Sequence, residues 1–433
     1  MFRKSAITAI TLLAAASIAG CGGSGGGAEA PQTNAADDFD TTKPVTVKIA
    51  DTGMLTDEEF QLYLVEPLKK KYPNITLELI RFKYSVDRFQ LLLGQGVKFD
   101  LLLEANLLFD DVIAARLADN MEPMLKKYKI DISKFDQVAV ESFKIASGGQ
   151  YLSAVPYTGH FNALYYNKDL FDKFGVAYPK DGMSWDETIE IARKMTRTDN
   201  GTVYLGLDPN LPFRTASALG LAIVDSKTNQ STVTNEKWKQ IFQMYRTIYE
   251  MPGYQTKYVI NNFAEFTKGN QAMNAGLNML PNLAKATGLN WDMVSFPSFK
   301  EAPNIGHEFD GHGIVVTSIS DKKEAAYKVV EVFLSDENQL SMARNGKLPM
   351  LKDKKVQDEF GKSLPFLQGK NVPAIFKTTP AKSHIPTPYD SKARTIMNNR
   401  SKDILFGTKD LNTGMREIDE EINKMIAENK ASN

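Results

Sequence analysis

The chain alternates between short apolar segments with the two-residue period of strands and longer segments with the periodicity of helices. Three strands and two helices are predicted in its first quarter, with the strands at 45–49, 75–79 and 100–103 and the helices at 56–68 and 85–93. The spacing of Thr56 and Glu59 predicts a capping box at the start of the first helix, which Pro67 should perturb. This order of elements favours an open, doubly wound α/β sheet with mostly parallel strands.

The same patterns return later in the chain. Ser184 and Glu187 predict a second capping box in front of an amphipathic helix, and a further helix should open at Asp321. Residues 314–316 are apolar throughout, as in a buried strand, and 199–201 form an Asp-Asn-Gly sequence that is typical of a hairpin turn. These segments predict a second α/β region after the first.

Polar residues and a methionine follow two of the predicted strands. Thr52 and Met54 come after the first strand, and Glu104 and Asn106 come after the third. Ligands of open α/β sheets bind beyond the carboxyl ends of the strands, so these four residues are candidates for a binding site. A loop with solvated polar side chains fits any one of these positions equally well.

Composition narrows the class of protein. The 433 residues are 42% apolar and 24% charged, which is typical of a soluble globular protein, and the length predicts two domains or lobes. Lys+Arg and Asp+Glu cancel at 52 each, so the chain lacks the basic excess of a nucleic-acid-binding protein. A single cysteine excludes an internal disulfide framework and a cysteine-rich zinc site.

The N-terminus has the layout of a secretory signal. Arg3 and Lys4 precede an apolar stretch, 6–16, that is too short to span a bilayer stably. The stretch leads to Ile18-Ala19-Gly20-Cys21, which resembles a bacterial lipobox, so we expect residues 1–20 to be removed and Cys21 to carry lipid. Residues 21–43 then form a flexible tether to the extracytoplasmic face of the cell membrane. A soluble signal with an incidental cysteine is the alternative.

Motifs for catalysis are lacking in the sequence. There is no G-x-S-x-G, and the segment 361–363 lacks the upstream glycine of a phosphate-binding loop. His307 and His312 stand one residue too far apart for the zincin helix motif, and only four histidines are present. We therefore predict a binding protein, not an enzyme, with no metal or cofactor. A glycosidase with paired carboxylates stays open, because their separation cannot be judged from sequence.

Several segments together resemble a known family. They are 149–157 (GQYLSAVPY), 165–171 (YYNKDLF), 174–176 (FGV), 184–187 (SWDE), 266–273 (FTKGNQAM), 311–314 (GHGI), 323–326 (KEAA) and 346–349 (GKLP). In this order and spacing they resemble the family 1 extracellular solute-binding proteins, which are the receptors of carbohydrate-importing ABC transporters and include the maltose-binding proteins.

The resemblance implies a two-lobed, periplasmic-binding-protein-like fold of type II, with a sugar held between the lobes. Each lobe should contain a mostly parallel sheet flanked by helices. The first lobe is expected at 44–158 with 312–352, and the second at 159–311 with 353–433. The chain should cross between the lobes near 157–162, 308–312 and 351–356.

The resemblance also places site residues. His160 stands where maltose-binding proteins have a sugar-binding acid, Glu104 and Asn106 replace a binding aromatic residue and its polar neighbour, and Asn278 replaces a stacking tryptophan. The crossing segments add four further candidates, which are Tyr157, Phe161, Asp310 and His312. Phe213, Trp291 and Tyr389 are other aromatic residues that could stack on a sugar, whereas Trp185 and Trp238 are interpreted as packing residues.

These features together predict a lipid-anchored receptor that delivers a sugar or oligosaccharide to the permease subunits of an ABC importer. Its partners would be the carbohydrate, the permease and, through Cys21, the membrane, with no nucleic acid. We expect a monomer and, since the anchor replaces retention in a periplasm, a Gram-positive cell. The alternatives are the same fold with a peptide, polyamine or chelate as its ligand, a polysaccharide-acting lipoprotein enzyme, and a sensor or adhesion module.

Overall fold

The computed structural model describes residues 39–83, 85, 87–254 and 260–431, and the compact unit within it begins at Phe39. The predicted signal sequence, the lipobox and Cys21 lie outside the described residues. In the part of the chain that is described, no helix has the length and apolar character that a membrane-spanning helix needs.

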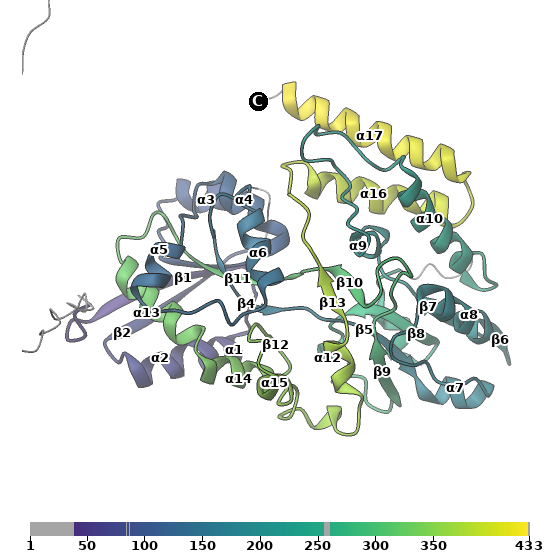
Figure 1. The fold of residues 1–433 in the computed structure, drawn as a ribbon, viewed down its shortest axis with the longest axis horizontal. Helices are drawn as coiled ribbons and strands as arrows, with labels where there is room; N and C mark the ends of the chain where they lie inside the picture. The colour runs from purple at the N-terminus through teal and green to yellow at the C-terminus, as the bar shows by residue number, and fades with distance from the viewer. Residues whose placement is uncertain (1–38, 84, 86, 255–259, 432–433) are drawn as a thin grey trace, which may run out of the picture. The chain divides into compact units, whose positions relative to one another are not determined.

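Six strands form the sheet of the first lobe, in the order β12-β4-β11-β3-β1-β2 (Figure 1). They are β1 (Val45–Asp51), β2 (Ile75–Arg81), β3 (Leu101–Ala105), β4 (Val155–Gly159), β11 (Gly311–Val316) and β12 (Leu348–Pro349). Strand β1 lies between β2 and β3 and is parallel to both, as the sequence predicts. The three leucines at the start of β3 are fully buried, which is typical of an inner strand covered on both faces.

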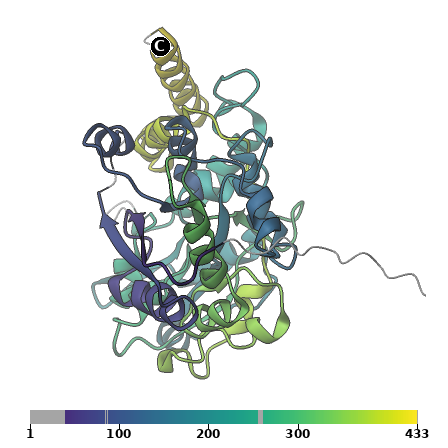
Figure 2. The same ribbon diagram turned by 90° about the vertical axis from the view of Figure 1, so that its left-hand side faces the viewer.

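Helices cover both faces of this sheet (Figures 1 and 2). They are α1 (Asp57–Phe60), α2 (Glu66–Lys71), α3 (Arg88–Gly94), α4 (Phe109–Ala114), α5 (Glu122–Lys127), α6 (Gln137–Ile145), α13 (Lys323–Phe333), α14 (Asp336–Arg344) and α15 (Lys354–Gln357). Thr56 and Glu59 form the predicted capping box before α1. The perturbation expected at Pro67 is a π-helical turn over Gln61–Val65, after which α2 begins with the proline in its first turn.

The second lobe has a five-stranded sheet in the order β6-β7-β8-β5-β9. Its strands are β5 (Asn162–Asn167), β6 (Arg197–Asp199), β7 (Thr202–Asp208), β8 (Gln271–Leu277) and β9 (Trp291–Ser295). Strands β6 and β7 form the predicted hairpin, and both Asn200 and Gly201 in its turn have positive φ values.

Helices of the second lobe pack on its sheet and on one another. They are α7 (Lys168–Phe174), α8 (Trp185–Met195), α9 (Pro212–Ser217), α10 (Glu236–Tyr249), α11 (Phe263–Thr267), α12 (Leu280–Leu283), α16 (Asp390–Leu405) and α17 (Leu411–Ala431). Ser184 and Glu187 form the second predicted capping box, before α8. Trp185 and Trp238 are buried in the core of this lobe, so their interpretation as packing residues is confirmed.

Three segments lead from one sheet toward the other. The chain leaves the first sheet at the end of β4 and enters the second with β5 two residues later. It returns through β10 (Ile305–Glu308), which pairs with β13 (Thr379–Ala381), and continues directly into β11. The third connection follows β12, since Val356 packs in the first core and Phe360 packs in a cluster with Phe161.

The two-lobed α/β fold is confirmed, but the expectation of mostly parallel sheets is wrong. In the first sheet only the two pairs made by β1 are parallel, and in the second only β7 and β8 are. The connections between the lobes explain part of the difference. Strand β4 runs out of the first lobe and β11 runs back into it, so these neighbours must be antiparallel. The hydrophobic period of a strand shows which of its faces are buried, but it does not show whether the strand runs parallel or antiparallel to its neighbours.

Candidate functional site

The carboxyl end of β1 holds a tight loop in place. The carboxylate of Asp51 accepts hydrogen bonds from the backbone N–H groups of Gly53 at 2.9 Å and Met54 at 2.7 Å, and it pairs with Arg81. Met54 packs against the first core. Thr52 Oγ1 is buried without a hydrogen-bond partner among the described protein atoms. Of the two candidates here, only Thr52 offers a free polar group.

Glu104, at the end of β3, is a buried ion-pair partner. Its carboxylate lies 3.1 Å from Arg88 Nη2 and accepts a 3.0 Å hydrogen bond from the N–H of Ala105. Burial raises the pKa of Glu104, although Arg88 acts in the opposite direction. The side chain is fully buried in this arrangement and fixes the loop that carries Asn106, and its contact with a ligand stays a prediction.

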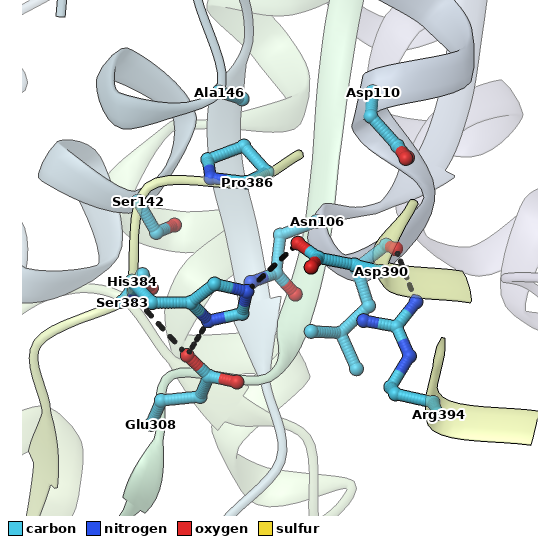
Figure 3. A pocket seen from close by; sticks show the side chains of 11 residues that line it. Asn106, Asp110, Ser142, Ala146, Glu308, Ser383, His384, Pro386, Asp390 and Arg394 are labelled. Atoms are coloured by element: carbon cyan, nitrogen blue, oxygen red, sulfur yellow. Dashed lines mark hydrogen bonds and ion pairs between the residues drawn. The ribbon is translucent and has the colours of Figure 1, made fainter. Parts of the chain in front are cut away.

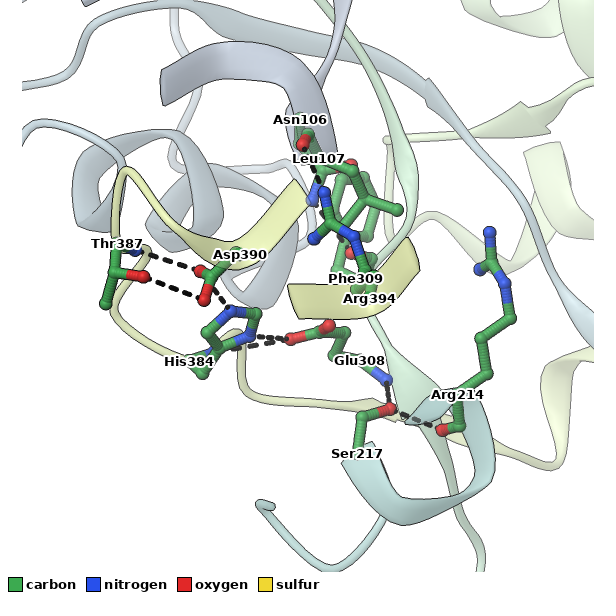
Figure 4. Close-up of polar contacts among 10 residues, drawn as sticks. All are labelled: Asn106, Leu107, Arg214, Ser217, Glu308, Phe309, His384, Thr387, Asp390 and Arg394. Atoms are coloured by element: carbon green, nitrogen blue, oxygen red, sulfur yellow. Dashed lines mark hydrogen bonds and ion pairs between the residues drawn. The ribbon is translucent and has the colours of Figure 1, made fainter. Parts of the chain in front are cut away.

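Asn106 ties the end of β3 to the second connection between the lobes (Figure 4). Its Nδ2 donates to the carbonyl of Phe309 at 2.8 Å, and its Oδ1 accepts from the N–H of Gly311 at 2.9 Å. The residue is half-buried. Asn106 therefore joins a first-lobe strand to the segment between β10 and β11.

Glu308, His384 and Asp390 form a buried chain of charges next to Asn106 (Figures 3 and 4). His384 Nδ1 lies 2.8 Å from Glu308, and Nε2 lies 3.0 Å from Asp390. Burial acts to lower the pKa of His384, but the hydrogen bonds to Asp390 and Glu308 outweigh it and raise the pKa to about 10. The ring is therefore an imidazolium that donates from both nitrogens at neutral pH.

These residues line a small pocket to which both lobes contribute, and we call it the charged pocket (Figure 3). The first lobe supplies Asn106, Leu107, Asp110, Ser142 and Ala146, and later segments supply Glu308, Ser383, His384, Pro386, Asp390 and Arg394. Arg394 Nη2 donates to the carbonyl of Leu107 at 3.4 Å, which bridges α16 and the turn before α4. The cavity volume is about 30 Å³, close to that of one water molecule.

Asp110 adds an acid to the charged pocket. Burial and the neighbouring Asp111 raise the pKa of Asp110 to about 6, against a weaker opposite effect of Arg394. The pocket thus combines carboxylates, an imidazolium, a guanidinium and an amide. Such a set supplies hydrogen-bond donors and acceptors of fixed geometry. At about 30 Å³ the pocket in this arrangement holds no more than one water molecule, so a sugar could enter it only with the lobes further apart.

A second polar group, the histidine cluster, lies on the crossing segments and consists of His160, Arg214, Asp310 and His312. Arg214 Nη1 lies 2.6 Å from the buried carboxylate of Asp310, and the rings of His160 and His312 meet edge to face at 5.2 Å. Burial lowers the pKa of His160 and, together with that neighbouring ring, lowers the pKa of His312 to about 3. Both histidines are therefore neutral, and His312 Nδ1 is buried without a partner among the described atoms.

The remaining candidates take packing or capping positions. Tyr157 is fully buried and its ring packs at a tilt against that of Phe333, with the centroids 4.7 Å apart, and Phe161 packs edge to face on Phe360. Asn278 Oδ1 accepts from the N–H of Leu280 at 3.0 Å at the start of α12. Ligand contact by Tyr157 stays a prediction. Of the other aromatic candidates, Trp291 is buried, whereas Phe213 and Tyr389 are half-buried at the edge of the second core.

The structure brings together residues that the sequence did not single out. Glu308, His384, Asp390 and Arg394 meet Asn106 in one pocket, although more than 270 positions separate Asn106 from His384. The only local signal is the four-residue spacing of Asp390 and Arg394, which places them on one face of α16. In the described residues, no three His, Cys, Asp or Glu side chains are placed to hold a metal ion.

Comparison with solved structures supports the fold. An ABC substrate-binding protein from Listeria monocytogenes, in complex with cycloalternan, matches with a TM-score of 0.71 and 18% identity, over 89% of this chain and all of that one. A sugar transporter from Rhizobium etli in an open conformation matches with a TM-score of 0.72 and 22% identity, over 87% and 99%. The sugar-binding protein MalE from Xanthomonas citri gives 0.71 and 17%, over 89% and 98%.

A family model also matches the sequence directly. It is the model of the bacterial extracellular solute-binding protein, and it matches residues 54–340, from the loop after β1 to the middle of α14. The match includes the whole second sheet, four of the six strands of the first sheet and the first two connections between them. This chain therefore belongs to the bacterial extracellular solute-binding proteins.

Proposed function

We propose that the protein binds a sugar or oligosaccharide between its two lobes and delivers it to the permease subunits of an ABC importer. Family membership supports capture of a solute outside the cytoplasm. The similar structures from Listeria, Rhizobium and Xanthomonas are described as a complex with cycloalternan, a sugar transporter and a sugar-binding protein. Their chemistry favours a carbohydrate for this chain too.

One observation carries the proposal, namely that polar side chains of both lobes converge on the charged pocket. Asn106 from the first lobe bonds to the backbone of the second connection at Phe309, and Arg394 from α16 bonds to the first-lobe backbone at Leu107. A ligand that contacts both parts favours the arrangement in which they are close, because only there does it make all of its contacts. Hydroxyl groups left unpaired would cost about 1–3 kcal/mol each, which gives selectivity.

The site favours hydrogen bonding over stacking. Tyr157 and Trp291, two of the aromatic residues proposed from sequence, are buried in the cores, while charged groups line the pocket. Thr52, Asp310 and His312 remain candidates for contact at the same edge of the first sheet, with His160 close to His312. A sugar recognised mainly by charge-assisted hydrogen bonds fits these groups.

The N-terminal sequence completes the proposal. Lipid on Cys21 would anchor the protein to the extracytoplasmic face of the membrane, and residues 21–43 would let the folded body move near the permease. Such a tether raises the effective concentration of receptor at the importer without any additional contact. This arrangement suits a monomer in a Gram-positive cell, where no periplasm retains a free receptor.

A thermal-shift screen of the purified protein tests the proposed function. Mono- and oligosaccharides are compared with peptides and polyamines as controls. A ligand that binds only the folded state adds about 2.7 kcal/mol of stability at one hundred times its dissociation constant. We expect a shift with one sugar series and recovery of that sugar unchanged. A response to controls alone would overturn the carbohydrate assignment, and turnover of the sugar would indicate an enzyme.

A pair of arginine substitutions on α16 tests the site. Arg394→Gln removes the charged pocket's guanidinium, and the affinity for the sugar should fall roughly 10- to 100-fold, the effect of one charge-assisted hydrogen bond. Arg400→Gln is the matched control, because Arg400 pairs with Glu421 of α17 on the exposed surface at 2.7 Å. Equal affinities of the two variants in calorimetric titration would remove the charged pocket from the binding site.

A further inference from the structure

A second and larger cavity lies among the segments that connect the lobes. Its walls come from the turn between β4 and β5, from Phe309 between β10 and β11, from the chain after β12, and from the segment that leads into β13. The central strands of Figure 1 locate these segments. The volume is about 280 Å³, and none of its lining residues lines the charged pocket. We call it the crossing cavity.

Two polar side chains in the wall of the crossing cavity each have an oxygen atom without a hydrogen-bond partner among the described residues. Asn162 is only 6% exposed, and its Oδ1 makes no hydrogen bond with the described protein atoms. The same holds for the buried Oγ1 of Thr378. Both side chains adjoin Gly306, where an added Cβ would lie 3.3 Å from Asn162 Nδ2 and 2.8 Å from Thr378 Cγ2.

Asn162 Oδ1 and Thr378 Oγ1 would each be stabilised by a hydrogen-bond partner. A buried polar atom without one costs about 1–3 kcal/mol, and most such atoms in proteins are satisfied. Both side chains lie beside Gly306 and line the same cavity, Asn162 from β5 and Thr378 from the residue before β13. A single group that donates to Asn162 Oδ1 and bonds to the Thr378 hydroxyl would satisfy both.

Most of the other lining residues of the cavity are apolar, and the uncharged polar side chains of Gln357 and Thr379 are among the rest. Phe161, Phe376 and Met350 supply rings and a thioether, and the charged lining residues, Asp136 and Lys352, pair with each other at 3.5 Å. His160 also lines the cavity and is neutral because burial lowers its pKa. A charged molecule would therefore lose its hydration without gaining a counter-charge, so the wall selects an uncharged one.

The size of the cavity fits a small organic molecule. An engineered apolar cavity of about 150 Å³ binds benzene, and drug-binding pockets begin at about 300 Å³. We propose that the crossing cavity is a second ligand site, for a small uncharged molecule with an apolar ring or chain and one hydroxyl group. The apolar part would pack between Phe161 and Phe376, and the hydroxyl would bond to Asn162 and Thr378.

Benzyl alcohol is the probe, and toluene is its matched control without the hydroxyl. Met350 lines the cavity, so the protein is labelled with 13C at the methionine methyl groups, and the Met350 signal is assigned with Met350→Leu. We expect benzyl alcohol to shift this signal saturably. Thr378→Val should weaken benzyl alcohol binding roughly fivefold, the effect of one hydrogen bond, and leave the affinity for toluene unchanged.

Two more variants keep the test decisive if Thr378→Val perturbs folding. Asn162→Leu should weaken the same probe by a similar factor, while Thr247→Val removes a hydroxyl from a half-buried position on α10, outside the crossing cavity, and should leave the binding of benzyl alcohol unchanged. No shift at Met350, or equal binding of benzyl alcohol to all variants, would overturn the second site. Displacement of the probe by a sugar found in the thermal-shift screen would also overturn it, because the cavity would then belong to the sugar site.

This result is independent of the proposed function. The probe experiment is done without sugar, so a protein that binds no carbohydrate can still bind benzyl alcohol. Conversely, a sugar receptor whose crossing cavity holds only water would show no shift at Met350 while still responding in the sugar screen.

Discussion

His384 provides the sharpest test of the electrostatics, because one cation lies between two buried carboxylates. Replacing it by glutamine in His384→Gln removes the charge and leaves Glu308 and Asp390 facing each other. The side chain is only 22% exposed, so solvent screens the interaction weakly. Breaking a buried ion pair by removing one partner typically costs 3–5 kcal/mol.

The pKa gives an independent magnitude and fixes the pH window. Although burial opposes it, the hydrogen bonds to Asp390 and Glu308 raise the pKa of His384 from 6.5 to about 10. At 1.36 kcal/mol for each tenfold change in proton affinity, this difference corresponds to roughly 5 kcal/mol. Because the folded pKa is the higher one, the stabilisation is complete below about pH 6.5 and is lost progressively as the pH rises to about 10.

Urea unfolding of the wild type and His384→Gln at pH 6 and pH 9.5 is the assay. We expect the variant to be about 3–5 kcal/mol less stable at pH 6, and the difference to fall below about 1 kcal/mol at pH 9.5. His307→Gln is the matched control: burial lowers the pKa of His307 to about 3, so the ring is neutral at both pH values and its effect should not change. The same destabilisation by His384→Gln at both pH values would refute the cationic histidine.

Two further substitutions test other buried contacts. Arg214→Met leaves the carboxylate of Asp310 buried without its cation and should lower the free energy of unfolding, measured by urea titration, by about 3–5 kcal/mol. Adding Asp310→Asn removes the unpaired charge and should restore much of this loss. An equal loss in the double variant would contradict an ion-pair role. Gly313→Ala would place a Cβ 2.5 Å from the ring of Phe143 and should lower the stability by about 1–3 kcal/mol. The smaller side chain of Phe143→Leu should restore part of this loss. An unchanged unfolding temperature of Gly313→Ala would refute the close packing.

Local sequence signals predicted the start of several elements accurately. The capping boxes at Thr56 and Ser184 and the hairpin turn at Asn200 form as expected, because each depends on contacts within a few residues. Asp321 was expected to open a helix, but α13 begins at Lys323 and has no side-chain cap. There the helix is stabilised by its apolar face, which packs against the first core, and tertiary packing sets the end.

The candidate site was predictable only where it follows the strands of the first sheet. Asn106 was expected at the carboxyl end of β3, and it does line the charged pocket. Glu104, two residues before it and inside β3, points into an ion pair with Arg88. Residues two apart on a strand share a face, so the strand period cannot tell these two residues apart, and only their three-dimensional partners decide which one reaches the pocket.

The four histidines show why protonation could not be predicted from sequence. His160, His307 and His312 are buried beside aromatic rings or other histidines, and burial lowers the pKa of each. His384 is also buried, yet its pKa is raised, since carboxylates from β10 and α16 lie on both sides of the ring. Glu308 is far from His384 along the chain, whereas Asp390 follows His384 by only six residues. The charge of a histidine thus depends on which side chains the folded chain places beside its ring.

The same residues therefore connect the lobes and line the charged pocket. Asn106 binds the backbone on both sides of Asp310, and Glu308 bonds to His384 with its side chain and to Ser217 Oγ with its N–H at 2.9 Å (Figure 4). A ligand in the pocket acts on groups that hold the second connection, so its contacts change the free energy of moving one lobe against the other. A change at Asn106, at Glu308 or at Arg394, whose guanidinium bonds to the first-lobe carbonyl of Leu107, should accordingly alter ligand affinity and lobe closure together.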